Sequence, residues 1–180
     1  MFRKLLPTDA DQLRRHLLAL SPTERRMRFH GVVADAVIER RCRRIDWFRT
    51  VAVGYVVAGR LRGVAELYFD RSLWPHEVEL AVTVQTPWQG RGVGTELTRR
   101  AVMMARNRGA ERVIMLCLVE NAPMRRIARK LTDALRHDGG AVAAALGLRR
   151  ATPLSLLEEL VQDGTGGWSA VADRLVAPPA

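Results

Sequence analysis

The feature that most constrains this chain is a glycine-rich loop, Gln89–Gly94, which separates two segments of different hydrophobic period. Before the loop, residues 77–84 alternate, with apolar side chains on one face, and this predicts a β-strand. After it, Thr95 caps a predicted helix to Arg108, and Gly109 stands where a helix C-terminus favours glycine. Free N–H groups at such a helix N-terminus bind anions, of which a pyrophosphate is one. The alternative is a tight turn that holds no ligand.

Two familiar phosphate-binding loops do not fit the spacing. A P-loop ends in Gly-Lys followed by Ser or Thr, whereas Gly94 is followed by Thr95 and Glu96. A dinucleotide-binding fingerprint spaces its glycines as G-x-G-x-x-G, while this loop reads G-x-G-x-G. From the residues alone, two interpretations therefore remain: an anion-binding loop of a different fold, or a turn that binds no ligand.

The rest of the chain predicts an α+β fold, in which helices alternate with mostly antiparallel strands. The expected helices are residues 9–20 capped by Thr8, a helix from Ser21 with Glu24 closing a capping box, 35–45 and 122–131. The expected strands are residues 2–6, 50–58, 64–69 after a turn at 59–63, 112–119, and 141–148 after the turn Asp138-Gly139-Gly140. The run 112–119 is almost continuously apolar, which is typical of a strand buried on both faces.

Composition narrows the class of partner. The 180 residues fit one domain, and no apolar run approaches the ~20 residues that span a bilayer. The first residues lack the apolar core of a signal peptide, so we expect a cytoplasmic protein with no membrane partner. Cys42 and Cys117 stand alone and the histidines are scattered, which predicts no metal site. The net charge of +10 comes mainly from dispersed arginines, so nucleic acid is not the expected partner.

The residues around the glycines resemble a known family. Gln89–Gly94 matches the Q/R-x-x-G-x-G/A signature of the GNAT N-acetyltransferase superfamily. Three further segments are similar to the GNAT domains of bacterial protein lysine acetyltransferases: Leu20–Phe29, Glu79–Val84 and Glu120–Leu131. The resemblance implies a central mixed, mostly antiparallel sheet, splayed between strands 4 and 5, with helices on both faces. It covers residues 1–150 as a GNAT domain and leaves residues 151–180 as a C-terminal helical extension.

The resemblance also implies acetyl-CoA as cosubstrate, with no metal. In the family, the pantetheine arm pairs with the exposed backbone of the fourth strand, the pyrophosphate lies on the glycine loop, and an Asn follows the fifth strand. The matching cofactor-binding residues are Val82, Val84, Gln89, Gly90, Arg91, Gly92, Val93, Gly94, Thr95 and Asn121. Asn121 is equally interpreted as a helix N-cap, and both roles are compatible. A backbone N–H near Val84 is the implied oxyanion donor.

The implied reaction is acetyl transfer to an amine, either a small molecule or a protein lysine. The amine must lose its proton, because a free lysine has a pKa of ~10.4. Glu79 matches the family's glutamate on the fourth strand and is the expected general base, with Glu77 on the same face as the reserve. The alternative for both is an exposed strand charge. The alternative function is a non-catalytic acetyl-CoA sensor or interaction module.

Two positions depart from the family pattern. Many members have a tyrosine seven residues after the Asn to protonate the leaving thiolate, and this chain has Ala128 there. Thr132-Asp133 replaces the usual Gly-Phe, which ends a helix and packs beside the acceptor. These departures leave the general acid and one wall of the acceptor site undefined.

The tail predicts two amphipathic helices. The first begins at Thr152-Pro153 and ends near Gln162, with Leu154, Leu157, Leu160 and Val161 expected to face inward. The second is expected over residues 168–176 after a glycine-rich break. We expect the tail to pack on its own domain; the alternatives are an exchanged or homodimer-forming arm and, last, contact with a membrane. An arm would give a concentration-dependent sedimentation coefficient that becomes constant on truncation after Arg150.

Overall fold

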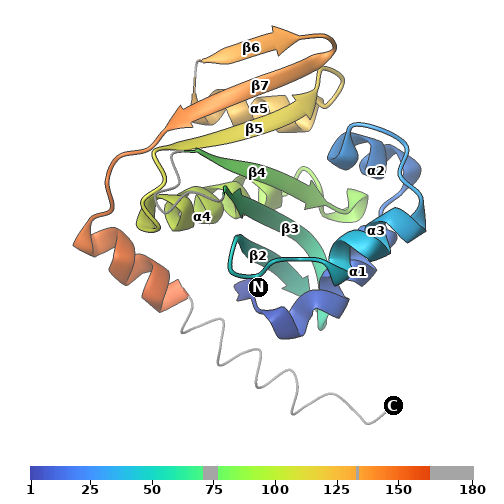
Figure 1. Ribbon diagram of the computed structural model, residues 1–180, viewed down its shortest axis with the longest axis horizontal. Helices are drawn as coiled ribbons and strands as arrows, with labels where there is room; N and C mark the ends of the chain where they lie inside the picture. The colour runs from blue at the N-terminus through green and yellow to red at the C-terminus, as the bar shows by residue number, and fades with distance from the viewer. Residues whose placement is uncertain (71–76, 133, 163–180) are drawn as a thin grey trace.

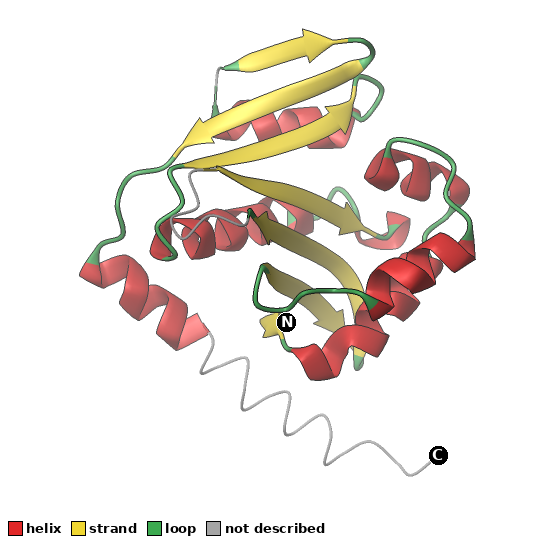
Figure 2. Ribbon diagram, in the orientation of Figure 1, coloured by secondary structure: helices red, strands yellow, loops and turns green. Residues whose placement is uncertain are grey.

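The computed structural model describes residues 1–70, 77–132 and 134–162, which form an open seven-stranded sheet with helices on both faces (Figures 1 and 2). The strand order is β1-β2-β3-β4-β5-β7-β6. Every neighbouring pair is antiparallel except β4 with β5, which is parallel. This confirms the predicted α+β class and the mixed, mostly antiparallel sheet.

Three helices precede the long strands: α1 (Ala10–Leu18), α2 (Pro22–Phe29) and α3 (Asp35–Arg43). The capping box predicted for α2 is confirmed, because Glu24 N donates to Ser21 Oγ at 3.2 Å and Ser21 N donates to Glu24 Oε2 at 2.7 Å. Both reciprocal bonds satisfy donors that a helix N-terminus leaves free.

The start of the first helix differs from the prediction. A 3-10 turn, η1 (Pro7–Asp9), precedes α1, and Thr8 does not act as its cap. Asp9 is drawn instead into a buried pair with Arg3, whose Nη1 and Nη2 lie 2.7 and 2.8 Å from the two carboxylate oxygens. This bidentate pair fixes the chain between β1 (Phe2–Leu5) and α1, so tertiary contact overrides the local capping signal.

The next three strands form an antiparallel meander: β2 (Thr50–Val57), β3 (Arg60–Phe69) and β4 (Glu77–Val84). The predicted five-residue turn at 59–63 is wrong, because β3 already begins at Arg60. Ala58 and Gly59 both have positive φ, 48° and 68°, so two residues are enough to reverse the chain. Such a pair matches the right-handed twist of the flanking strands.

The second half of the fold has two helices and three strands: α4 (Val93–Asn107), β5 (Arg112–Leu118), α5 (Ala122–Leu131), β6 (Leu135–Asp138) and β7 (Ala141–Gly147). The predicted bounds of α5 are confirmed, as is the hairpin turn before β7. The predicted N-cap of α4, Thr95, is wrong by three residues, because Gly92 is the N-cap and the helix begins at Val93.

The two faces of the sheet bury separate apolar clusters. One cluster packs α1 and α3 against β2 and β3, and includes Leu13, Leu17 and Ile38. The other packs α4 and α5 against the opposite face, and includes Leu97 and Met104. The helices α1–α3 and α4–α5 therefore hold the sheet from its two sides (Figure 1).

Strand β5 is buried on one face, so the predicted burial on both faces is wrong. Val113, Met115 and Cys117 are buried in the cluster with α4 and α5. On the other face Leu116 is 43% exposed and Ile114 is half-buried. Helix α1 packs on β3, and α2 contacts both β4 and β5, but Leu116 of β5 stays exposed, so an apolar strip of β5 remains open to a ligand or solvent.

The first tail helix spans residues 153–162, as predicted, but its orientation is opposite to the prediction. Its buried side chains are Ser155 and Glu159, which are 2% and 9% exposed. The four side chains that we expected to face inward are exposed: Leu154, Leu157, Leu160 and Val161. The second predicted tail helix, at residues 168–176, lies outside the described residues.

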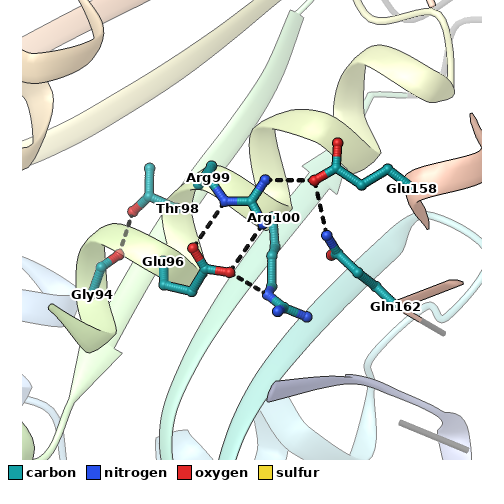
Figure 3. A network of polar contacts seen from close by, with 7 residues as sticks. All are labelled: Gly94, Glu96, Thr98, Arg99, Arg100, Glu158 and Gln162. Atoms are coloured by element: carbon teal, nitrogen blue, oxygen red, sulfur yellow. Dashed lines mark hydrogen bonds and ion pairs between the residues drawn. The ribbon is translucent and has the colours of Figure 1, made fainter. Parts of the chain in front are cut away.

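Polar groups of α4 explain this orientation. Asn107 Nδ2 donates to Glu159 Oε2 at 2.7 Å, and Ser155 Oγ donates to Asn107 Oδ1 at 2.7 Å. Farther along the same helices, Arg99 joins Glu96 to Glu158, as Figure 3 shows. Because α4 offers hydrogen-bonding groups on this side, it selects the polar stripe of the tail helix and leaves the apolar stripe outward.

A buried histidine ties α1 to the strands. His16 Nδ1 lies 3.2 Å from the carbonyl of Leu61, which can only accept, so Nδ1 carries the proton. His16 Nε2 then accepts from Thr83 Oγ1 at 2.9 Å. Burial lowers the pKa of His16 to about 4, partly opposed by the bond to Leu61. His16 is therefore neutral in the folded protein at neutral pH.

We expect the free energy of unfolding to fall between pH 7 and pH 5 because of His16. The folded pKa lies below the unfolded value of ~6.5, so only the unfolded state gains a proton in this window, and stability rises with pH. At pH 5, protonation of His16 in the unfolded state lowers the free energy of unfolding by about 2 kcal/mol. Urea denaturation of wild type and His16→Gln across this range measures it.

Candidate functional site

A cleft of about 590 Å³ opens where β4 separates from β5. The two strands pair only over Glu77–Glu79 against Arg112–Ile114, although both continue beyond this stretch. The walls of the cleft come from α2, the last residues of β4, the glycine loop and α5. The split between the strands therefore leads directly to the N-terminus of α4.

The free edge of β4 faces this split. Gln85 N donates to the carbonyl of Arg62 on β3 at 2.9 Å. Because backbone groups of successive strand residues point to opposite edges, those of Val82 and Val84 point away from β3 and toward the split. Both residues line the cleft, and the carbonyl of Val84 accepts from Gln89 Nε2 at 2.7 Å. The strand edge and the glycine loop are thus joined at one end of the cleft.

The glycine loop turns sharply into α4. Gly90 and Gly92 have φ of 71° and 79°, which side chains other than glycine adopt at a cost. The bond from Glu96 N to the Gly92 carbonyl closes the first turn at 3.0 Å. The N–H groups of residues 93–95 precede that bond and have no partner within the helix. They form an anion site, which the helix dipole strengthens.

A third glycine serves close packing. A Cβ on Gly94 would lie 3.1 Å from Ile127 Cδ1 of α5. Glycine at this position therefore lets the start of α4 approach α5 and narrows the cleft between them.

The structure brings most of the predicted cofactor residues together. Eight of them line the cleft: Val82, Val84, Gln89, Gly90, Gly92, Gly94, Thr95 and Asn121. Arg91 lies with its guanidinium carbon 5.2 Å from the ring centre of Trp88 instead. The side chain of Val93 is buried in the core, so that only its backbone N–H is available.

Asn121 has the N-cap role that we gave as its alternative. Its Oδ1 accepts from Met124 N at 3.1 Å at the start of α5. Because the amide Nδ2 is a separate donor, the cap is compatible with a contact to a ligand in the cleft. Ala128, at the family's tyrosine position, is buried in the core between α5 and the sheet.

The two candidate carboxylates lie on one face of β4 but differ in their partners. Glu77 Oε1 lies 3.3 Å from Arg112 Nη1, and both side chains are exposed. Glu79 is exposed and stands opposite Tyr68 of β3 in register. Among the described residues it has no ion pair or hydrogen bond. Glu79 is at the last paired position before the strands separate, whereas neither carboxylate lines the cleft itself.

Helix α2 supplies cleft residues that sequence reasoning missed. Glu24 lines the cleft, and its Oε1 accepts from Thr86 N at 2.6 Å and from Thr86 Oγ1 at 3.0 Å. Burial would raise the pKa of Glu24, but hydrogen bonds from Ser21 and Thr86 outweigh it and lower the pKa. The capping box located Glu24 on α2, but no local signal placed α2 against the loop after β4.

An ion pair joins the two sides of the cleft entrance. Arg26 Nε of α2 lies 2.8 Å from Glu120 Oε1, which precedes α5. Both side chains are about half exposed, so the pair adds little stability. Its position shows that α2 reaches across the split between β4 and β5.

A second group that sequence reasoning missed surrounds Glu66 of β3. This carboxylate is fully buried, 2.8 Å from Arg28 Nη2 of α2 and 2.8 Å from Arg41 Nη2 of α3. Both arginines also donate to the hydroxyl of Tyr68. Burial would raise the pKa of Glu66, but the two guanidinium groups lower it to about 2. The sequence shows only scattered arginines here, because the partners come from three separate elements.

The part of the chain that the structure describes contains no cluster of His, Cys, Asp and Glu that could hold a metal ion. Within the same residues, no helix has both the length and the apolar character needed to cross a membrane.

Comparisons with known proteins agree with this geometry. The family model described as an acetyltransferase (GNAT) domain matches residues 1–132. The GNAT domain of S. lividans PAT superposes with a TM-score of 0.69 at 21% identity, covering 82% of this chain and 89% of that one. Comparison with curated protein sequences gives no match.

Two further solved structures share the fold. The ribosomal-protein-S18-alanine N-acetyltransferase from Escherichia coli has a TM-score of 0.60 at 15% identity, over 85% of this chain and 96% of that one. The PaiA N-acetyltransferase from Thermoplasma acidophilum, in complex with coenzyme A, has a TM-score of 0.58 at 14% identity, over 82% and 98%. Because these sequence identities are low, the comparisons show a shared fold alone.

Proposed function

The chain belongs to the GNAT acetyltransferase family, and we propose that it transfers an acetyl group from acetyl-CoA to an amine. The observation that carries the proposal is the continuity of one cleft from the split between β4 and β5 to the N-terminus of α4. A long cosubstrate with an anionic middle and a reactive end fits such a cleft.

The backbone would bind acetyl-CoA by two kinds of contact. The N–H groups at the start of α4 hold the pyrophosphate, since they have no partner in the helix. The edge of β4 at Val82 and Val84 pairs with the amides of the pantetheine arm, in the place that β5 vacates. An N–H near Val84 then stabilises the negative charge that develops on the thioester oxygen.

Glu79 is the proposed general base. The amine nitrogen attacks the thioester carbonyl, the new C–N bond forms, and the C–S bond breaks. Glu79 takes the proton of the amine directly or through a water. Its lack of a partner among the described residues supports this role over Glu77, which is already paired with Arg112. With Ala128 in place of a tyrosine, the thiolate of CoA leaves unassisted, which a thiol pKa of ~8.5 permits.

The acceptor is proposed to be an amine on a small molecule or on a protein lysine. The strip of β5 that includes Ile114 and Leu116 remains open on the face that carries Glu79, which leaves room for the acceptor beside the base. The open strip favours a substrate that brings apolar atoms together with its amine.

The proposal is tested by mixing the purified protein with acetyl-CoA and a panel of amines, and following the release of the free CoA thiol. Release that depends on both protein and amine, with mass spectrometry of the acetylated product, is the expected result. Saturable binding of acetyl-CoA with no release for any amine would instead favour the non-catalytic sensor or interaction module.

A further inference from the structure

The cluster around Glu66 carries an unbalanced positive charge. Two guanidinium groups share one carboxylate, and both also donate to the hydroxyl of Tyr68, which is the only other partner that they share within the described part of the chain. Burial raises the pKa of Tyr68, so its hydroxyl is neutral and acts as an acceptor. The Arg41 side chain keeps partial contact with solvent, but Arg28 and Glu66 are almost fully buried, and charges held out of water usually have a partner of opposite sign. The cluster is therefore short of one negative group.

Of the two arginines, Arg28 lines the cleft and Arg41 does not. The Arg28 side chain is 9% exposed, and a single nitrogen, Nη2, makes both of its hydrogen bonds within the cluster. Its Nε is buried without a hydrogen-bond partner among the described residues, and the hydrogen bonds given for Arg28 there involve neither Nε nor Nη1. Guanidinium donors are thus left over on the residue that borders the cleft.

Other charges of the cleft do not balance Arg28. The oxygens of Glu24 accept from Ser21 and Thr86, and Glu120 is paired with Arg26. Lys130 also lines the cleft, but it adds positive charge and belongs to α5. An anion that enters beside α2 would meet Arg28 as a cation with free donors.

The register of the sheet places this cation near the chemistry. Glu66 and Tyr68, which hold Arg28, stand opposite Ala81 and Glu79 of β4. Neighbouring strands are ~4.8 Å apart, so the residues that fix Arg28 lie one strand away from the proposed base. A substrate whose amine lies beside Glu79 can therefore reach Arg28 with a group a few bonds away.

We propose that Arg28 determines acceptor specificity by binding a carboxylate of the acceptor, so that the preferred substrate is an amine with a carboxylate close to it. This inference rests on the proposed acetyl transfer and adds its substrate class. An arginine suits the task because its planar donors match a carboxylate bidentately.

The first test needs only the wild-type protein and matched acceptors. L-glutamate is compared with glutamine, and each with its α-carboxamide, to distinguish side-chain from main-chain carboxylates. A lysine peptide with an adjacent glutamate is compared with the same peptide carrying glutamine, to distinguish a peptide source from a free amino acid. In at least one of these comparisons, we expect kcat/KM to be at least about tenfold higher for the acceptor that carries the carboxylate. The reason is that hydrogen bonds between oppositely charged groups are stronger than those between neutral groups.

Equal kcat/KM within every pair would overturn the inference and leave acetyl transfer standing. Binding supplies a readout that does not need turnover: calorimetry of the N-acetylated glutamate and lysine-peptide products, with CoA present, should show the same preference. Absence of that preference also overturns the inference. If the wild-type protein did not bind acetyl-CoA, that result would instead contradict the proposed function.

A pair of variants separates specificity from support of the fold. Arg28→Gln and Arg41→Gln each leave Glu66 with one guanidinium partner, so their structural costs are similar. We expect the carboxylate preference to fall to about one in Arg28→Gln, mostly through KM for the acceptor, and to persist in Arg41→Gln. Arg28→Lys, which keeps the charge without the fork, should retain part of it. An equal loss of preference in both glutamine variants would show a structural role only.

Discussion

Gly92→Glu is expected to raise the dissociation constant for acetyl-CoA by at least about 100-fold, measured by calorimetry. Gly92 is the N-cap of α4, and no atom lies within 4 Å of the position that its Cβ would take. The new side chain would therefore project into open space at the anion site. Two like charges ~4 Å apart repel by about 4 kcal/mol near a protein surface, which corresponds to a loss of affinity of about 1,000-fold, so the 100-fold stated is a lower bound.

Gly109→Glu is the matched control for this prediction. Gly109 follows the other end of α4, has the same φ of 79°, and also has no atom within 4 Å of a built Cβ. Both variants thus carry the same strain from a side chain in the left-handed region. Equal affinities of the two variants for acetyl-CoA would mean that the effect of Gly92→Glu is one of strain, and the loop would be a turn without a ligand.

Glu79→Gln is expected to lower kcat by about 10²- to 10⁴-fold, while the dissociation constant for acetyl-CoA stays unchanged. The amide keeps the size of the side chain but cannot take a proton from the amine. Because Glu79 stands outside the cleft lining, the loss should appear in turnover with a good acceptor and not in binding of the cosubstrate. Thiol release and calorimetry on the same preparation measure the two quantities.

Glu77→Gln provides the comparison on the same face of β4. Its carboxylate is already paired with Arg112, so we expect a much smaller effect on kcat. If Glu79→Gln turned over at the wild-type rate, the base would have to be sought among the carboxylates that do line the cleft, Glu24 and Glu120.

Several elements of the fold could be predicted because their signals are local. The capping box at Ser21 and Glu24 predicted the start of α2, and Asn121 as an N-cap predicted the start of α5. The glycines before β7 gave its hairpin turn. In each case the residues that determine the conformation lie within a few positions of one another, so a short segment of sequence includes every residue that takes part in the interaction.

Several predictions that failed depended on contacts with residues outside the element concerned. The apolar run of β5 did not show that one of its faces would remain open, because that depends on where α1–α3 end. The apolar stripe of the tail helix faces outward because Asn107 and Arg108 of α4 bind Glu159. Thr8 lost its capping role to the pair between Arg3 and Asp9. A hydrophobic pattern gives the period of an element but not the chemistry of the surface that it meets.

The sequence by itself determined the glycine loop and the strand and helix that it joins, because positive φ and unpaired N–H groups are properties of a few adjacent residues. It also identified the family through that loop. Only the tertiary structure decided which charges are paired: it separated Glu79 from Glu77 by their partners and brought Arg28, Arg41 and Glu66 together from three elements. Electrostatic pairing depends on distances of a few ångströms between segments far apart in the chain, and local patterns do not encode those distances.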